Sequence, residues 1–309
     1  MRPMSAPCRD KIEILSVELL EQHRPLVSDL RRLAKSLGLE FGWHYLLDLA
    51  WIIDNLGAVN GKHILDAGAG MGVLQWYLAE RGAEVLSVDR ASRADLPTHF
   101  RRRYHAVGLR PADLSPAGQS FWHNIGRVHG LRSRASLVGR AIYSRLSPRP
   151  APGRVVFYQQ DLQRLEAVAD EALDAVVAVS ALEHNPPPAL GQVVKELMRV
   201  IKPGGMFLAT LAAARDLDWY HQPSSGWCYT EASLRQAFYL PDQAPSNYER
   251  YDELFAALRD CAELREGLAR FYFRSGENGM PWGRWEPQYQ PVGVCKVKIT
   301  KIRGNEQYA

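Results

Sequence analysis

The chain has 309 residues, of which 46% are hydrophobic and 23% charged, an ordinary composition for a soluble globular protein of one large or two modest domains. No apolar run approaches the ~20 residues that span a bilayer, and charges interrupt the N-terminal segment before a signal-peptide core can form. The four cysteines form no Cys-x-x-Cys pair and have no histidine at zinc-finger spacing. We therefore expect no disulfide framework, no metal site, and a cytoplasmic protein with reduced thiols.

The net charge of +4 is unevenly distributed along the chain. Between Ser92 and Arg154 there are twelve arginines, no lysine and two acids, so this segment carries +10 and the remainder −6. Local charge says more about a binding partner than total charge does. The basic character of the chain is therefore local to this segment.

The first sixty residues are predicted to form an N-terminal helical extension without strands. Ser28 is a candidate cap for a helix that Gly38 ends. A second apolar helix is expected from about residue 43 to 56, with Gly57 after it.

From Gly61 the pattern becomes that of a βαβ unit. Residues 62–68 form a short apolar run that ends in glycines, 73–82 are helical, and 83–89 form a second apolar run that ends in an acid. The apolar runs are continuous rather than alternating, which indicates a parallel sheet covered on both faces.

The alternation resumes after Arg154 and completes the predicted domain, residues 61–305. Further strands are expected at 154–161, 173–180, 206–210, 269–275 and 292–300, the last antiparallel. Predicted helices cover 189–201, 230–238 with Thr230 as its cap, and 247–264, and Lys202–Gly205 forms a tight turn. These elements predict an α/β fold, a Rossmann-like, doubly wound, mostly parallel seven-stranded sheet with an N-terminal helical extension and a helical insert at about 92–153.

The turn from Asp66 to Gly72 lies between the first predicted strand and its helix, at the edge where parallel sheets bind ligands. Glycines let this backbone turn sharply and approach a ligand closely. Asp89 ends the second strand, twenty-one residues after Gly68, where a carboxylate can accept hydrogen bonds from both ribose hydroxyls. A dinucleotide site requires a glycine at position 73, which is Val73. An acid ahead of the glycines, as at Asp66, instead suits a cationic ligand without phosphate.

These segments together resemble class I S-adenosylmethionine-dependent methyltransferases. The resemblance covers residues 61–91 and 154–210, and the latter is similar to the small-molecule, type 11 branch. It implies an enzyme that uses S-adenosyl-L-methionine, with Asp161 at the adenine amino group and Leu162 beside it. The alternative is that these are turn glycines and strand-end acids of another α/β protein. The implied cofactor-binding residues are Asp66, Ala67, Gly68, Gly70, Gly72, Asp89, Arg90, Asp161, Leu162 and Ser180.

His184 is the candidate catalytic residue, because a hydroxyl nucleophile needs a general base with a pKa near the working pH. The resemblance places His184 and Glu183 at the floor of the active site. The alternative roles of His184 are to cap the following helix or to pack against the cofactor. Tyr220 and His221 lie in a long aromatic loop of the kind that lines substrates, and with Glu183 they are the predicted substrate-binding residues.

Two other methyl-transfer chemistries lack the residues that they require. Adenine- and glutamine-directed methyltransferases require Asn-Pro-Pro-aromatic at the end of the fourth strand, but here the run Asn185–Pro188 comes later and ends in Pro188. Pyrimidine C5 methylation needs a cysteine near the fourth strand, where none is present.

Within the insert, residues 119–147 have helical apolar spacing, with arginines at many other positions. Such a helix can pack its apolar face on the core and hold its arginines in water, lie on an anionic membrane, cover an anionic substrate or bind RNA. Its charge favours a phosphate-bearing acceptor, such as a lipid-linked or nucleotide-linked sugar.

Three functions follow. The first is a small-molecule methyltransferase acting on oxygen, cytoplasmic and with peripheral membrane contact through 119–147 as an option. The second is an RNA methyltransferase that uses the insert, with nucleic acid the less favoured partner. The third is a non-catalytic protein that binds the cofactor or has lost it.

Overall fold

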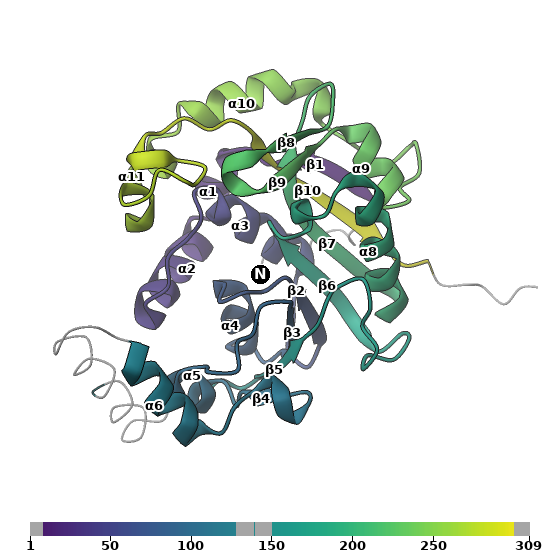
Figure 1. Cartoon of the computed structure of the whole chain (residues 1–309). Helices are drawn as coiled ribbons and strands as arrows, with labels where there is room; N and C mark the ends of the chain where they lie inside the picture. Colours follow the sequence, from purple (N-terminus) through teal and green to yellow (C-terminus); the bar gives the residue numbers. More distant parts are fainter. Residues whose placement is uncertain (1–8, 128–138, 140–149, 300–309) are drawn as a thin grey trace, which may run out of the picture.

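The computed structural model describes residues 9–127, 139 and 150–299, and its centre is one mixed sheet (Figure 1). Within the described residues, ten strands belong to this sheet. Eight follow one another in space: β1 (Lys11–Ile14), β10 (Gln290–Val297), β7 (Ile201–Ala213), β6 (Leu173–Val179), β2 (His63–Ala67), β3 (Glu84–Asp89), β5 (Arg154–Gln159) and β4 (Val107–Gly108). The other two, β8 (Trp219–His221) and β9 (Gly226–Tyr229), form a hairpin that joins β7 through β9.

The strands from β7 to β4 run parallel, and only β10, β1 and β8 run antiparallel to their neighbours. Nearly every residue of β2 and β6 is buried, as their continuous apolar sequences predict. One side of the sheet packs against α2 (Arg24–Leu37), α3 (Tyr45–Leu56) and α4 (Val73–Ala79). The other side packs against α8 (Pro187–Val200), α9 (Glu231–Ala237) and α10 (Tyr251–Arg259). The α/β, doubly wound, mostly parallel prediction is confirmed.

The predicted strand count of seven is wrong in two ways. Four short strands were not expected, namely β1, β4, β8 and β9. The predicted strand at 269–275 is instead a 3-10 helix, η5 (Arg270–Phe273). The two edges of β10 are paired with β7 and β1, so residues 269–275 have no free edge of β10 with which to pair.

The prediction that the first sixty residues contain no strand is also wrong. In β1 Ile12 and Ile14 are buried and alternate with half-buried Lys11 and Glu13, the period-two pattern of a strand with one covered face. Four residues are too few for this pattern to be distinguished in sequence from a helical run. The extension thus contributes a strand to the sheet as well as the helices α1 (Glu18–Gln22), α2 and α3.

Most predicted helix boundaries are confirmed. Gly38 and Gly57 end α2 and α3 in positive-φ conformations, and Thr230 caps α9 by accepting a hydrogen bond from the Ser233 amide. Ser28 does not cap α2, because α2 begins four residues earlier, at Arg24, with Pro25 in its first turn. The predicted helix 247–264 is divided into η4 (Tyr248–Arg250), α10 and α11 (Ala262–Glu266).

The predicted turn Lys202–Gly205 is a bulge inside β7. Ile201 of β7 pairs with Leu173 of β6, and the next pair is Met206 with Ala175. The four residues of β7 between these pairs, 202–205, have no partner in β6. Gly204 has φ +81°, a conformation that glycine adopts without strain.

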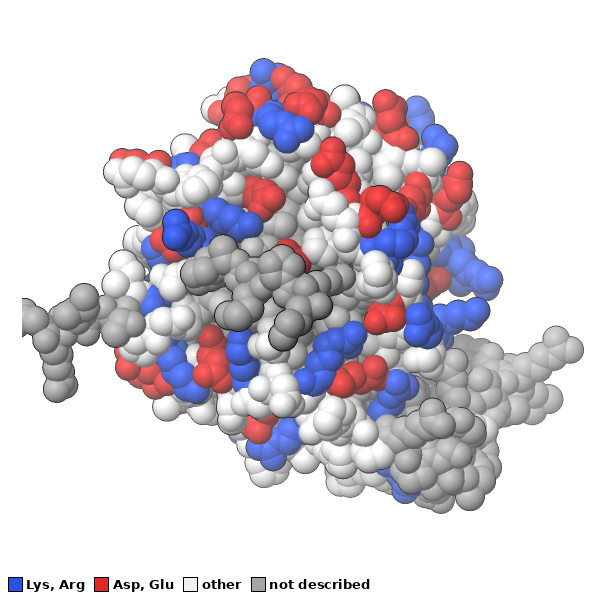
Figure 2. All heavy atoms as spheres, turned by 180° about the vertical axis from the view of Figure 1, so that it is seen from behind, with Lys and Arg blue, Asp and Glu red and all other residues white. Residues whose placement is uncertain are grey.

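The described part of the insert contains α5 (Thr98–Arg103), β4, η1 (Pro111–Asp113) and α6 (Ala117–Arg127). Of the predicted helix 119–147, residues 119–127 belong to α6, Gly139 is also helical, and the other positions lie outside the described residues. On the face in Figure 2, basic and acidic side chains of the described residues are interspersed.

Among the described residues no helix is long and apolar enough to cross a membrane. The same residues contain no cluster of three or more histidine, cysteine or acidic side chains suited to a metal. Cys228 and Cys261 are free thiols, but Cys295 is disulfide-bonded, which corrects the prediction that all thiols are reduced.

Candidate cofactor and acceptor site

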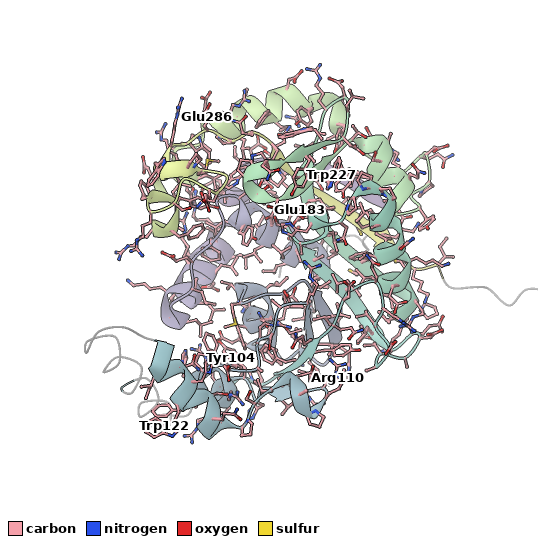
Figure 3. The ribbon with its side chains drawn as sticks, viewed as in Figure 1. Tyr104, Arg110, Trp122, Glu183, Trp227 and Glu286 are labelled. Carbon is pink, nitrogen blue, oxygen red and sulfur yellow. The ribbon has the colours of Figure 1, made fainter. Side chains whose placement is uncertain are left out.

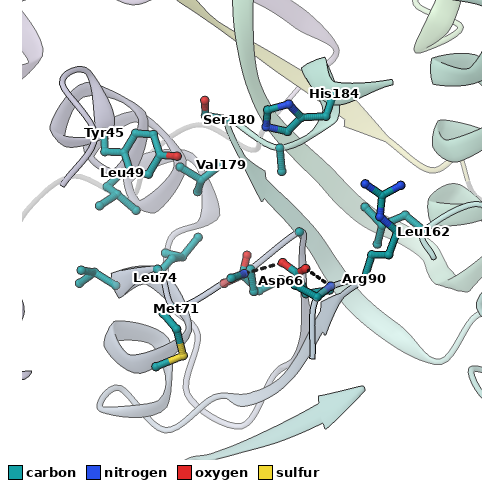
Figure 4. A pocket seen from close by; sticks show the side chains of 18 of the residues that line it. Tyr45, Leu49, Asp66, Met71, Leu74, Arg90, Leu162, Val179, Ser180 and His184 are labelled. Atoms are coloured by element: carbon teal, nitrogen blue, oxygen red, sulfur yellow. Dashed lines mark hydrogen bonds between the residues drawn. The ribbon is translucent and has the colours of Figure 1, made fainter. Parts of the chain in front are cut away.

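A cavity of about 580 Å³ opens at the carboxyl ends of β2, β3, β5 and β6 (Figure 4). Its floor is the glycine-rich turn after β2, and its roof is the segment after β6, which contains η2 (Leu182–His184). A third wall comes from the segment before α3 and from α3 itself. The predicted site residues that line the cavity are Asp66, Gly68, Gly70, Gly72, Asp89, Arg90, Asp161, Leu162, Ser180 and His184.

The conformation of the glycine-rich turn depends on two glycines. Gly68 and Gly70 have φ of +69° and +48°, values that a side chain makes costly. The amides of Gly68 and Ala69 both donate to the Val88 carbonyl, at 2.9 and 3.1 Å. A Cβ on Gly68 would lie 2.5 Å from the Cβ of Ala181, so the turn and the roof approach each other closely here.

Replacing Gly68 with alanine should therefore destabilise the protein. Its left-handed backbone and the clash with Ala181 together predict a loss of about 2–4 kcal/mol in the free energy of unfolding. Gly191→Ala in α8 is the control, because no heavy atom lies within 4 Å of its Cβ position and helix propensity favours alanine. Urea unfolding of both variants measures the difference. Equal stabilities would show that the turn relaxes around a side chain.

Asp89 connects the end of β3 to the glycine-rich turn. One carboxylate oxygen accepts from the Gly70 amide at 2.8 Å and the other from the Ala91 amide at 2.7 Å. A carboxylate accepts about four hydrogen bonds, so both oxygens retain capacity toward the cavity that Asp89 lines.

Asp66 lies beneath the turn and is almost fully buried. Burial raises the pKa of this carboxyl group to about 7, while the positive charge of Arg93 lowers the pKa and the negative charge of Asp89 raises it. A cationic ligand in the cavity would favour the ionised carboxylate.

His184 lies at the roof, exposed, with its ring toward the cavity (Figure 4). Its Nδ1 is 2.9 Å from the Ser225 carbonyl oxygen. A carbonyl oxygen can only accept, so Nδ1 carries a proton, and when the ring is neutral its Nε2 is free to accept one. The geometry provides a proton acceptor at the roof.

Glu183 is buried, does not line the cavity and lies close to β9 (Figure 3). Ser180 donates its hydroxyl hydrogen bond to Oε1, while Oε2 is buried and has no partner among the described residues. Burial raises the pKa of this carboxyl group. Ser180 itself has φ +46°, an uncommon conformation for a residue with a side chain.

Three other predicted residues are not at the cavity surface. Ala67 is buried within β2. His221 is buried, its Nδ1 lies 2.7 Å from the Ser224 hydroxyl, and burial lowers its pKa. Tyr220 is exposed and packs against Trp227, with ring centroids 5.6 Å apart. The hairpin β8–β9 therefore supports η2 and His184 from behind instead of lining the cavity.

The third wall was not predicted as part of the site. It consists of Leu39, Glu40, Phe41, Tyr45 and Leu49. Tyr45 and Ser180 both line the cavity, so the extension and the roof meet there. The sequence signal was the apolar and aromatic segment between two helices, but nothing in it indicates which strand edge it approaches.

Next to this wall, His44 and Asp48 form a buried pair, with Nδ1 and Oδ2 2.7 Å apart. The second oxygen of Asp48 is buried without a partner.

Comparison with known proteins found one family model and a group of curated relatives. A family model described as "Methyltransferase domain" matches residues 119–209 and so leaves the glycine-rich turn outside its match. The ubiquinone biosynthesis O-methyltransferase of Bordetella pertussis is 28% identical over 166 residues, 53% of this chain and 49% of that protein. That of Leptothrix cholodnii is 26% identical and covers 53% and 51%. The chain thus spans about half the length of the curated relatives it matches.

Solved structures with similar chains were also found. The [4+2]-cyclase SpnF has a TM-score of 0.45 and 14% identity, covering 94% of this chain and all of that one. The 1,6-didemethyltoxoflavin-N1-methyltransferase of Burkholderia thailandensis, solved with S-adenosylhomocysteine, has a TM-score of 0.41 and 16% identity, covering 96% and 93%.

Proposed function

We propose that this chain, which carries a class I S-adenosylmethionine-dependent methyltransferase domain, transfers a methyl group to a hydroxyl oxygen of a small, largely apolar acceptor. One juxtaposition supports the proposal above all. The glycine-rich turn with its two acids forms one side of the cavity, and His184, whose Nδ1 is held by the Ser225 carbonyl, lies on the other.

The residues present fit the methyl donor. A cavity of about 580 Å³ is within the ~300–1,000 Å³ range of small-molecule sites. Asp89 would accept hydrogen bonds from the ribose hydroxyls, Asp161 and Leu162 would contact the adenine, and Asp66 would favour the cationic end through its negative charge. S-adenosylmethionine, when bound, supplies an electrophilic methyl carbon with a neutral thioether as leaving group.

His184 is the proposed general base. Nε2 accepts the proton of the acceptor hydroxyl as the new oxygen–carbon bond forms and the sulfur–carbon bond breaks, and the electron pair of the broken bond stays on sulfur. Positioning of the two reacting atoms and exclusion of water supply most of the remaining acceleration. Phe41, Tyr45 and Leu49 exclude water from the third wall. We propose that the extension of residues 1–60 serves the domain of residues 61–305 in this way.

The acceptor is proposed to be apolar. The third wall is mostly apolar and aromatic, and the curated relatives are named as ubiquinone biosynthesis O-methyltransferases. The earlier expectation of a phosphate-bearing, lipid-linked or sugar acceptor rested on the arginines of the insert. Five of its seven described arginines, Arg93, Arg101, Arg103, Arg110 and Arg154, bind groups of the protein itself.

A panel of acceptors separates the candidate functions. We expect methyl transfer from radiolabelled S-adenosylmethionine to phenolic or other apolar hydroxyl compounds, with little transfer to sugar phosphates. Transfer to RNA with binding that weakens steeply with salt would favour the nucleic-acid alternative. Binding of the cofactor without transfer to any acceptor would favour the non-catalytic alternative.

The affinity for the methyl donor is expected to rise as the pH rises through about 7, by up to about tenfold between pH 6 and 8, because ionised Asp66 attracts the donor's positive charge. Asp66→Asn should bind more weakly at pH 8 and show little of this pH dependence. Calorimetric titration at three pH values measures both proteins, and equal pH dependence in the two would contradict the role of Asp66.

Asp66 affects the free energy of unfolding in the opposite direction, because its pKa in the folded protein, about 7, exceeds the ordinary value of 3.8. Its contribution therefore stabilises the fold at low pH and is lost as the pH rises from 3.8 to about 7.

A further inference from the structure

Arg93 is the first arginine of the insert, and its side chain turns back beneath the glycine-rich turn. Nη1 donates to the Gly70 carbonyl at 3.1 Å and to the Ser87 hydroxyl, and Nη2 donates to the Ser87 carbonyl at 2.8 Å. Its guanidinium carbon is 4.9 Å from the ring centre of Phe157. Arg93 is not among the residues that line the cavity. Its donors are directed at the backbone that forms the cavity floor.

A second side chain completes the support of the turn. Gln75 in α4 donates to the carbonyls of Gly70 and Gly72 at 3.2 and 3.1 Å. Ser87 donates to Oε1 of Gln75 at 2.7 Å, and both side chains are fully buried. Arg93, Ser87 and Gln75 therefore form one hydrogen-bonded network. Its two outer members, Arg93 and Gln75, donate hydrogen bonds to backbone carbonyls of the glycine-rich turn. Because these carbonyls are fixed from below, the amides of the turn keep a fixed direction at the cavity.

Arg93 also supplies positive charge beneath the floor. Burial lowers its pKa, and the negative charges of Asp89, Asp66 and Asp113 oppose this. Among the described residues, Arg93 is the positive charge that acts on Asp66, while Asp89 acts in the other direction. Two acids at one cavity repel each other, and a buried guanidinium that attracts both offsets that repulsion.

We propose that Arg93 is a positioning residue for the methyl donor, which fixes the glycine-rich turn and balances the charge of Asp66 and Asp89. This inference rests on the proposed placement of the donor in the cavity. It assigns the start of the basic insert to cofactor binding rather than to an anionic acceptor.

Arg101 provides a matched control from the same insert. Its guanidinium donates to the carbonyls of Leu96, Ser115 and Ala94 and to the Ser120 hydroxyl, so it is as fully hydrogen-bonded as Arg93. All of these partners lie within the insert, and none belongs to the glycine-rich turn. Removal of Arg101 should loosen the insert without disturbing the floor of the cavity.

Calorimetric titration with S-adenosylhomocysteine and S-adenosylmethionine tests the proposal in Arg93→Met, Arg93→Lys, Arg101→Met and Asp89→Ala. Arg93→Met should weaken both ligands by about tenfold or more, since hydrogen bonds from a charged group to the turn are lost. Arg93→Lys, which keeps the charge but not the fork of donors, should be intermediate. Arg101→Met should lower the melting temperature and leave affinity within about twofold.

The pH dependence separates this role from general destabilisation. Without Arg93 the pKa of Asp66 rises further, so the rise in S-adenosylmethionine affinity moves above about pH 7 in Arg93→Met. It stays near the wild-type pH in Arg93→Lys and Arg101→Met. An equal loss of affinity at every pH would overturn the charge-balancing part of the proposal.

The remaining outcomes are distinguishable. If Arg93→Met does not unfold cooperatively, the affinity is compared between Arg93→Lys and the wild type instead. A wild-type affinity of Arg93→Lys would then overturn the positioning role of Arg93. Wild-type affinity in a folded Arg93→Met would overturn the inference alone, provided that Asp89→Ala loses binding. If Asp89→Ala also keeps its affinity, the proposed placement of the donor is wrong, and the inference fails with it.

Discussion

Replacing Asp89 with alanine is expected to weaken binding of S-adenosylmethionine by about a hundredfold or more. Two hydrogen bonds from ribose hydroxyls to a carboxylate are worth about 1.5–3 kcal/mol each, and each 1.4 kcal/mol is tenfold in affinity. The variant also loses the bonds from the Gly70 and Ala91 amides that fix the turn.

Asp174→Ala is the matched control for this experiment. Asp174 is a strand acid of β6 with a lysine partner, Lys202, and an amide partner, His63, but it does not line the cavity. It should lose stability and retain affinity. A dissociation constant for Asp89→Ala within threefold of wild type would mean that the ribose is not held there.

Replacing His184 with alanine is expected to reduce kcat by about 10²–10⁴-fold, the usual contribution of a positioned acid–base group. Affinity for S-adenosylhomocysteine should change little, because the predicted cofactor contacts lie mainly at the floor. Single-turnover methylation of the best acceptor, with the cofactor saturating, measures the chemical step.

His63→Ala is the control for His184. His63 is exposed at the first residue of β2, whereas the cavity lies at the other end of that strand. This variant should keep the wild-type rate. A wild-type rate in His184→Ala would exclude His184 as the base and leave Glu183, with its unpartnered buried oxygen, as the next group to replace.

The core of the fold was predictable because its signals are local. The strand, turn, helix and strand from His63 to Asp89 are contiguous, and the glycines, the strand-end acid and the apolar runs each have one physical interpretation there. The floor of the cavity was predicted for the same reason. The roof followed from the resemblance of the segment that contains Ser180 and His184.

The parts that were missed depend on contacts between distant segments. Lys11 pairs with Cys295, and Ile14 bonds with Asn247, so neither partner is indicated by its own neighbourhood. Tyr45 reaches the cavity only because α3 packs on β6 and β7.

In the insert, the charge was predictable from the sequence, but the partners of the arginines were not. The count of arginines gave the charge correctly, but charge alone does not say where a guanidinium is directed. Arg93 and Arg101 are neighbours in the same basic segment, yet the first binds the glycine-rich turn and the second binds the insert. Only their hydrogen-bond partners distinguish a residue that affects the cofactor from one that stabilises its own segment.

A crystal structure of the protein with S-adenosylhomocysteine tests the placement of the methyl donor directly. We expect both ribose hydroxyls to contact the Asp89 carboxylate and the sulfur to face the side of the cavity where His184 lies. A ligand bound with its ribose away from Asp89, or outside the cavity at the ends of β2 and β3, would contradict this placement.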